Sequence, residues 1–204
     1  MIKRSYTKVL LTAFLIHLVI LPNLLAEDAS RIEYKIKAAF LYNFLKFIEW
    51  PEQKKVKDDE PLVIGIIGKD VFGDIFDELK DKKVDGKKVV VKKFRSIDEI
   101  DEQWREKNNK LHPDIDAIRG THLLFICPSE KDHFKEVLDT VREHGVLTVA
   151  DTEGFLEIGG IINLLTENKK IRFEINLIAA KQSKIDIRSQ LLRLAKRTIR
   201  DDDN

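Results

Sequence analysis

The sequence predicts one α/β domain with a largely parallel central sheet, flanking helices and a C-terminal antiparallel hairpin. Short apolar runs alternate with amphipathic stretches between residues 62 and 149, which is the order of βαβ crossovers around a parallel sheet. Two later runs flank a short polar turn, which is the pattern of a hairpin. Residues 27–200 lie within the usual size of a single domain, so we expect no second one.

The domain is predicted to begin with a helix over residues 31–50. Apolar residues recur there at three- and four-residue steps, and Pro51 ends the helix. A charged loop over residues 52–60 leads to an apolar run at 62–67 that is rich in β-branched residues. Such a run predicts a strand buried on both faces of the sheet.

Helices and strands are predicted to alternate through the middle of the chain. The expected elements are a helix over 70–80, a strand over 88–94, a helix from 96 to about 107, a strand over 122–127, a helix from 129 to Gly145 and a strand over 146–149. Ser96 and Glu99 have the spacing of a capping box at a helix start. Residues 108–120 are predicted to form a linker.

The last third of the domain contains the predicted hairpin, with strands over 160–166 and 170–176. Apolar and polar residues alternate along the second strand, so one face is expected to meet the core and the other to face water or a partner. A short helix over 177–182 and an amphipathic helix over 187–199 are expected to complete the domain. Residues 201–204 form an acidic tail.

Residues 1–26 have the order of a secretory signal. Lys3, Arg4 and Lys8 precede an apolar run of about 13 residues, which is shorter than the roughly 20 that a membrane-spanning helix needs. We expect cleavage near Ala26 and a periplasmic location, with a retained N-terminal membrane anchor as the alternative. No cysteine follows the apolar run, which excludes a lipid-modified N-terminus.

Composition argues against several classes of function. The 36 basic and 35 acidic residues leave a formal net charge of +1, so no global field attracts nucleic acid. Cys127 is the single cysteine and cannot close an intramolecular disulfide. The histidines do not have the spacing of metal ligands, and no nucleophile has a base at a recognisable spacing. We therefore expect no metal, no cofactor and no catalytic residue.

Two stretches contain polar residues or glycines in settings that suggest contacts. A double glycine within residues 154–163 directly precedes a strand, which usually marks a bulge or the close approach of another backbone. Asn43 lies among three phenylalanines and needs a partner for its amide. Gly68 and Gly73 lie between a strand and a helix, where backbone amides can hold an anion. Purely structural roles stay open for all of these.

Four motifs resemble the YfiR-like family of periplasmic proteins. They are Lys37-Ala-Ala-Phe-Leu-Tyr-Asn-Phe-Leu-Lys-Phe-Ile-Glu-Trp-Pro51, Gly154-Phe with Gly159-Gly-Ile-Ile-Asn163, Arg172-Phe-Glu-Ile-Asn176, and Ser189-Gln-Leu-Leu-Arg-Leu-Ala195. The resemblance implies a non-enzymatic regulator that represses a membrane-bound diguanylate cyclase or histidine kinase by binding its periplasmic domain. It thereby implies a role in cyclic-di-GMP signalling and biofilm regulation. An outer-membrane lipoprotein is a second implied partner, and a homodimer stays open.

The hairpin and the loop over residues 154–160 are expected to form the surface that meets the partner. Phe155 is predicted to be its apolar anchor, with Arg172 and Glu174 as orienting charges, because aromatic and arginine side chains dominate interface energetics. The predicted partner-binding residues are Phe155, Glu157, Asn163, Arg172, Glu174 and Asn176. The alternative function is a periplasmic sensor of a nucleotide or amino acid, with Asn43, Gly68 and Gly73 as ligand-binding residues.

Overall fold

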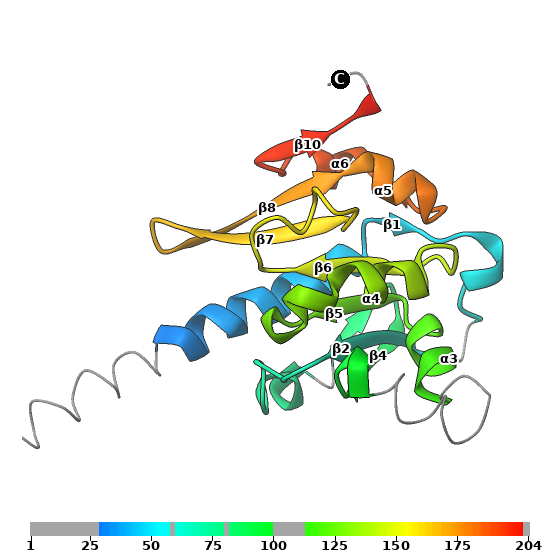
Figure 1. The fold of residues 1–204 in the computed structure, drawn as a ribbon, viewed down its shortest axis with the longest axis horizontal. Helices are drawn as coiled ribbons and strands as arrows, with labels where there is room; N and C mark the ends of the chain where they lie inside the picture. Colours follow the sequence, from blue (N-terminus) through cyan, green and yellow to red (C-terminus); the bar gives the residue numbers. More distant parts are fainter. Residues whose placement is uncertain (1–28, 58–59, 80–81, 100–112, 202–204) are drawn as a thin grey trace, which may run out of the picture.

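The computed structural model describes residues 29–57, 60–79, 82–99 and 113–201, and shows a twisted sheet with helices on both faces (Figure 1). The described strands form an eight-stranded sheet in the order β10-β8-β7-β6-β5-β2-β4-β3. They are β2 (Leu62–Ile67), β3 (Lys83–Val84), β4 (Lys87–Phe94), β5 (Leu123–Ile126), β6 (Leu147–Ala150), β7 (Ile162–Glu167), β8 (Lys170–Asn176) and β10 (Arg197–Ile199). The five neighbours β4, β2, β5, β6 and β7 run parallel, which confirms the predicted fold class.

Helices cover the two faces of this sheet, and each face has its own hydrophobic core. The helical segments are an N-terminal helix (residues 29–45), α3 (Pro113–Arg119), α4 (Phe134–Val141), α5 (Leu177–Gln182), α6 (Ser189–Leu192) and 3₁₀ turns at Glu52–Lys54, Ile75–Leu79 and Pro128–His133. The N-terminal helix buries Leu41 and Phe44 against one face, where Phe44 contacts Phe173 edge to face. The other face is covered by α3 and α4.

The predicted hairpin is present, and its turn explains its register. β7 and β8 pair antiparallel from Ile162–Ile175 to Glu167–Lys170. The connecting residues Asn168 and Lys169 both have positive φ, +48° and +62°, as the common two-residue hairpin turn requires. The turn is therefore one residue shorter than the sequence pattern predicted.

The first helix ends five residues earlier than predicted. It stops at residue 45, and Ile48–Glu49 form the short strand β1, which pairs antiparallel with β9 (Asp186–Ile187). Pro51 disfavours helical backbone at the residue before it, so the chain approaches the proline in an extended conformation. The Arg188 amide adds a 2.9 Å hydrogen bond to the Phe47 carbonyl.

Two further predictions for segments before β5 were wrong. Within residues 70–79 the helical structure is limited to the 3₁₀ turn at Ile75–Leu79, because Gly73 has a φ of +57° and the Asp70 carboxylate accepts a hydrogen bond from the Phe72 amide. The supposed linker 108–120 contains α3, which begins at a proline, a favourable first helical residue. Of the helix predicted from residue 96, residues 97–99 are helical, and residues 100–112 lie outside the described part.

The amphipathic helix predicted over 187–199 is also wrong. This stretch divides into β9, the four-residue α6 and β10, which adds a parallel edge strand to β8. The Lys196 amide donates to the Phe173 carbonyl at 2.8 Å as the chain joins the sheet. Leu194, which would lie on the apolar face of such a helix, is 64% exposed. Backbone pairing with β8 therefore outweighs the helical periodicity.

His122, directly before β5, should make the fold sensitive to acid. It is 7% exposed, its Nδ1 accepts the Val63 amide hydrogen at 3.0 Å, and burial lowers its pKa to about 4. The folded state therefore favours the neutral ring, and this stabilisation is complete above the unfolded pKa and is lost as pH falls through the folded pKa. Between about pH 7.5 and 4.5 we expect a loss of about 2–3 kcal/mol from this residue.

The measurement is urea unfolding of the protein and of His122→Asn at both pH values. The asparagine oxygen can accept the Val63 amide but cannot be protonated in this range, so the variant should lose less stability on acidification. The carboxylates titrate in both proteins, so their contribution to the loss of stability cancels when the two proteins are compared. An equal loss in the two proteins would contradict the assignment.

Candidate functional site

The loops that follow the parallel strands lie at the carboxyl edge of the sheet. Gly68 follows β2, Arg95 follows β4, Cys127 follows β5 and Asp151 follows β6. β7 pairs with β6 only through Ile162 and Asn163, so the rest of the hairpin extends beyond this edge. Figure 1 shows the hairpin and the start of the N-terminal helix projecting on the same side. Open α/β sheets hold their sites at this edge.

A buried ion pair joins the N-terminal helix to the end of β6. Lys37 is 4% exposed, and its Nζ lies 2.6 Å from Asp151 Oδ2. The Tyr34 hydroxyl donates to the same carboxylate oxygen at 3.1 Å, and its ring centroid lies 4.5 Å from Lys37 Nζ. Burial, with Asp151 beside it, raises the pKa of Tyr34, so this hydroxyl remains a donor.

The same lysine extends the network to the hairpin. Lys37 Nζ also lies 2.6 Å from Glu33 Oε1, and the Thr166 hydroxyl of β7 donates to that oxygen at 2.8 Å. Burial alone would raise the pKa of Glu33, but hydrogen bonds from Lys37 and Thr166 outweigh it and lower the pKa. The chain of contacts from Asp151 to Thr166 thus ties together β6, the N-terminal helix and the hairpin. We call these residues, with Tyr34, the edge network.

Two buried polar atoms beside this network have no partner within the described residues. They are Asp151 Oδ1 and the Thr152 hydroxyl oxygen. A buried unpartnered polar atom costs stability, so native structures contain few of them. Departures of this kind are expected at functional or strained sites more than in a framework optimised for stability alone.

Phe155, predicted to be a surface anchor, is fully buried. Its ring packs edge to face on Phe134 of α4 at 5.1 Å. It also covers Gly160, where a β-carbon would lie 2.2 Å from the ring, so the second glycine of the motif admits this ring. The prediction of a partner contact is corrected: in this conformation Phe155 forms the core of the loop over residues 151–160.

The two asparagines of the predicted surface are buried as well. Asn163 Oδ1 accepts the Thr152 amide hydrogen at 3.1 Å, which fixes the start of the loop. Asn176 Oδ1 accepts the Ala179 amide hydrogen and caps α5, while its Nδ2 donates to the Leu156 carbonyl at 2.9 Å. Their hydrogen bonds are made inside the domain, so the predicted surface role of both residues is corrected.

Glu174 and Glu157 share a partner that sequence reasoning missed. Arg197 of β10 donates to Glu174 Oε2 at 2.8 Å and to Glu157 Oε1 at 3.0 Å. The hydrogen bond from Arg197 lowers the pKa of Glu157, which is exposed, and Glu174 is only 9% exposed beneath the guanidinium. We call these three residues the arginine fork. Arg197 had been placed on a helix, so its spacing carried no signal of this contact.

One face of the hairpin remains open. Arg172 is exposed and pairs across the hairpin with half-buried Leu165, and the next pair on this face is Glu167 with Lys170. Cross-strand partners share a face, so these four side chains form one surface, which we call the hairpin face. Lys196 forms an ion pair with Glu167 at its margin. Of the predicted partner-binding residues, Arg172 and Glu157 are exposed.

The three predicted ligand-binding residues are not brought together. Asn43 is exposed, and its amide oxygen accepts a hydrogen bond from Lys46 at 3.0 Å, so the expected burial was wrong. Gly73 lies in an open turn with a positive φ. Gly68 lines a hollow with a volume of about 360 Å³.

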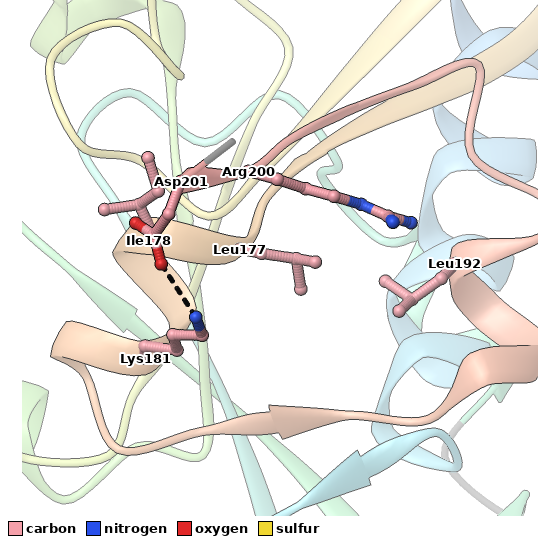
Figure 2. A pocket seen from close by; sticks show the side chains of 6 residues that line it. All are labelled: Leu177, Ile178, Lys181, Leu192, Arg200 and Asp201. Atoms are coloured by element: carbon pink, nitrogen blue, oxygen red, sulfur yellow. Dashed lines mark hydrogen bonds and ion pairs between the residues drawn. The ribbon is translucent and has the colours of Figure 1, made fainter. Parts of the chain in front are cut away.

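A second hollow lies between α5, α6 and the end of β10 (Figure 2). Its volume is about 290 Å³, and it is lined by Leu177, Ile178, Lys181, Leu192, Arg200 and Asp201. Lys181 and Asp201 form an ion pair of 2.8 Å across one side of it. The part of the chain that the structure describes contains no cluster of histidine, cysteine and carboxylate side chains suited to a metal ion. Nor does any helix there have the length and apolarity to cross a membrane.

Comparison with known proteins identifies the family. Residues 34–196 match the family model DUF4154, described as YfiR/HmsC-like. The chain belongs to the YfiR/HmsC-like family. This confirms the resemblance that the four motifs predicted.

Two solved structures are similar to this chain at low sequence identity. A conserved domain protein from Vibrio cholerae is 13% identical with a TM-score of 0.46, covering 67% of this chain and 54% of its own. An ABC domain in complex with L-Trp from Streptococcus pneumoniae is 12% identical with a TM-score of 0.48, covering 68% and 55%. The chain thus spans about half the length of these structures. No curated protein matches it.

Removal of Lys37 from the edge network should destabilise the fold. Lys37→Met leaves the Asp151 carboxylate buried without its cation, and we expect a loss of about 3 kcal/mol in the free energy of unfolding. Lys35→Met is the matched control, because Lys35 forms an exposed 3.0 Å ion pair with Glu78, and such pairs contribute about 1 kcal/mol or less. Urea denaturation measures both variants, and equal losses would contradict a special role of Lys37.

Cys127 should be inert in the folded protein. It is buried at the end of β5, and desolvation raises its pKa to about 12. At about pH 8 the thiolate fraction is then at least about a thousandfold below that of a free cysteine. Ellman's reagent should react slowly with the native protein and fast in guanidinium chloride. Comparable rates in both conditions would contradict the assignment.

Proposed function

We propose that this chain is a periplasmic regulator that represses a membrane-bound diguanylate cyclase or histidine kinase by binding its periplasmic domain. The observation that carries the proposal is the family match over residues 34–196, which includes most of the N-terminal helix, the hairpin and the loop between β6 and β7. Residues 1–26 serve as the export signal. This function requires no catalytic residue and no cofactor.

The hairpin face is the surface that best suits such a partner. It places one half-buried leucine, Leu165, among the charged side chains of Glu167, Lys170 and Arg172. Interfaces commonly combine an apolar centre with a polar rim, and arginine is enriched among the residues that carry binding energy. The opposite face of the hairpin packs on the N-terminal helix through Phe173, so the platform is supported from behind.

Repression then follows from differential affinity. A regulator that binds the inactive state of the receptor more tightly than the active state shifts the population toward inactivity. A nearly complete shift needs a difference of about 10⁴-fold in affinity between the two states. An outer-membrane lipoprotein that binds the same face would relieve repression by competition, and a homodimer would present two such faces to a dimeric receptor.

Reversal of charge at the centre of the hairpin face tests the proposal. Deletion of the gene should raise cellular cyclic di-GMP, or the phosphorylation of the kinase's response regulator, and the intact gene should restore the repressed level. Arg172→Glu should fail to restore it, with binding to the receptor's periplasmic domain weakened at least about tenfold. Lys92→Glu is the control, because Lys92 is exposed on β4, away from the hairpin.

Three results would contradict parts of this proposal. Unchanged signalling on deletion would exclude the regulatory role. Equal activity of the Arg172 and Lys92 variants would exclude the hairpin face while leaving the role intact. A mature protein that begins before Glu27 would exclude cleavage after Ala26, and a protein that fractionates with the cytoplasm would exclude the proposed export step.

A further inference from the structure

The hollow beside Gly68 lies where the order of the sheet reverses. β4 lies on one side of β2 and β5 on the other, so the chain crosses over β2 between these strands. The loop after β2 begins at Gly68, and the loop after β5 contains Ser129 and Glu130. Loops that leave adjacent strands in opposite directions open a crevice at the carboxyl edge, and open α/β sheets bind ligands in such crevices.

A buried carboxylate fixes the floor of this hollow. Glu130 is 1% exposed and accepts three hydrogen bonds, from the Ser96 hydroxyl at 2.8 Å, the Ile97 amide at 3.0 Å and the Ser129 hydroxyl at 3.1 Å. Ser129 Oγ in turn accepts the Lys69 amide hydrogen at 2.9 Å. The loops after β2, β4 and β5 are therefore held together before any ligand arrives.

Gly68 is adapted to this floor. Its φ is +93°, and a β-carbon there would lie 2.5 Å from both Glu130 Oε1 and Ser129 Oγ. A side chain would therefore displace the buried carboxylate and the serine. This explains why a glycine follows β2, and it makes the crevice a formed site rather than a gap between flexible loops.

The walls of the hollow carry charges of both signs. Its lining includes Lys69 and Arg95 as cations, and Asp98 and Glu99 as exposed carboxylates, around a volume of about 360 Å³. Within residues 29–57, 60–79, 82–99 and 113–201, the Lys69 and Arg95 side chains form no ion pair. The described lining contains no aromatic side chain. The volume is at the small end of ligand sites.

We propose that this hollow binds a small zwitterion that carries a primary ammonium and an anionic oxygen group. Asp98 and Glu99 would receive the ammonium, and Lys69 and Arg95 the anionic group. A simple anion would meet the two exposed carboxylates, and a simple cation would meet the two basic side chains. Quaternary ammonium groups are usually held by aromatic faces, and the described part of the lining contains none.

Two sources supply this chemistry. One is a free amino acid with a small polar side chain, for which L-serine is the probe. The other is the phosphoethanolamine headgroup of a lipid, for which soluble O-phosphoethanolamine is the probe. Direct binding to the purified protein tests the site without a receptor, so its outcome is independent of the proposed regulatory function.

Isothermal titration calorimetry provides the test. We expect saturable one-to-one binding of at least one probe, and binding at least about tenfold weaker for acetate and methylammonium, which each carry half of the recognised groups. Arg95→Gln and Glu99→Gln should each raise the dissociation constant at least about tenfold. Lys88→Gln removes a positive charge as Arg95→Gln does, but at the other end of β4, and it should leave the dissociation constant unchanged.

Each result decides the proposal. Binding of L-serine alone assigns a free amino acid, binding of O-phosphoethanolamine alone assigns the headgroup, and binding of both supports the shared chemistry. If neither probe binds at millimolar concentration, the proposed site is overturned. Binding that survives both Arg95→Gln and Glu99→Gln would overturn it too, because the ligand would then occupy another place.

Discussion

The buried contact between Lys37 and Asp151 is the constraint on which the arrangement of the carboxyl edge depends. Lys37 lies on the inward side of a helix that otherwise buries apolar residues such as Leu41 and Phe44. Apolar contacts are not directional and tolerate sliding of a helix over a sheet, whereas a buried ammonium needs its carboxylate at hydrogen-bond distance. The 2.6 Å contact therefore fixes where the helix lies along the sheet. Through Glu33 and Thr166 it also holds the end of the hairpin that lies next to the turn.

The loop that starts at Asp151 explains why the family motifs have their residues. Asn163 holds the Thr152 amide, Phe155 covers Gly160, and Asn176 holds the Leu156 carbonyl. Each of these contacts is made inside the domain. The motif residues therefore build the loop and place Glu157 beside Arg197.

Sequence patterns predicted the parallel strands and the hairpin because burial on both faces and alternation leave local signatures. They could not predict that 197–199 joins β8, since strand pairing depends on a distant edge and the local periodicity was helical. They also could not tell which side of a turn Phe155 occupies, because an aromatic beside glycines fits a core as well as a surface. The setting of Asn43 was misjudged for a related reason, because three neighbouring phenylalanines do not show on which side of the helix its amide lies.

Contiguous contacts connect the hollow with the arginine fork. Glu130 lies in the turn that leads into α4, whose Phe134 packs on Phe155, two residues before Glu157 in the arginine fork. Contiguity alone does not couple two sites; coupling requires two arrangements that a ligand binds with different affinity. The fork joins the three-residue edge strand β10 to the loop over residues 151–160, in addition to the backbone pairing of β10 with β8. A ligand that shifted the loop with Glu130 would act on the partner surface through this strand.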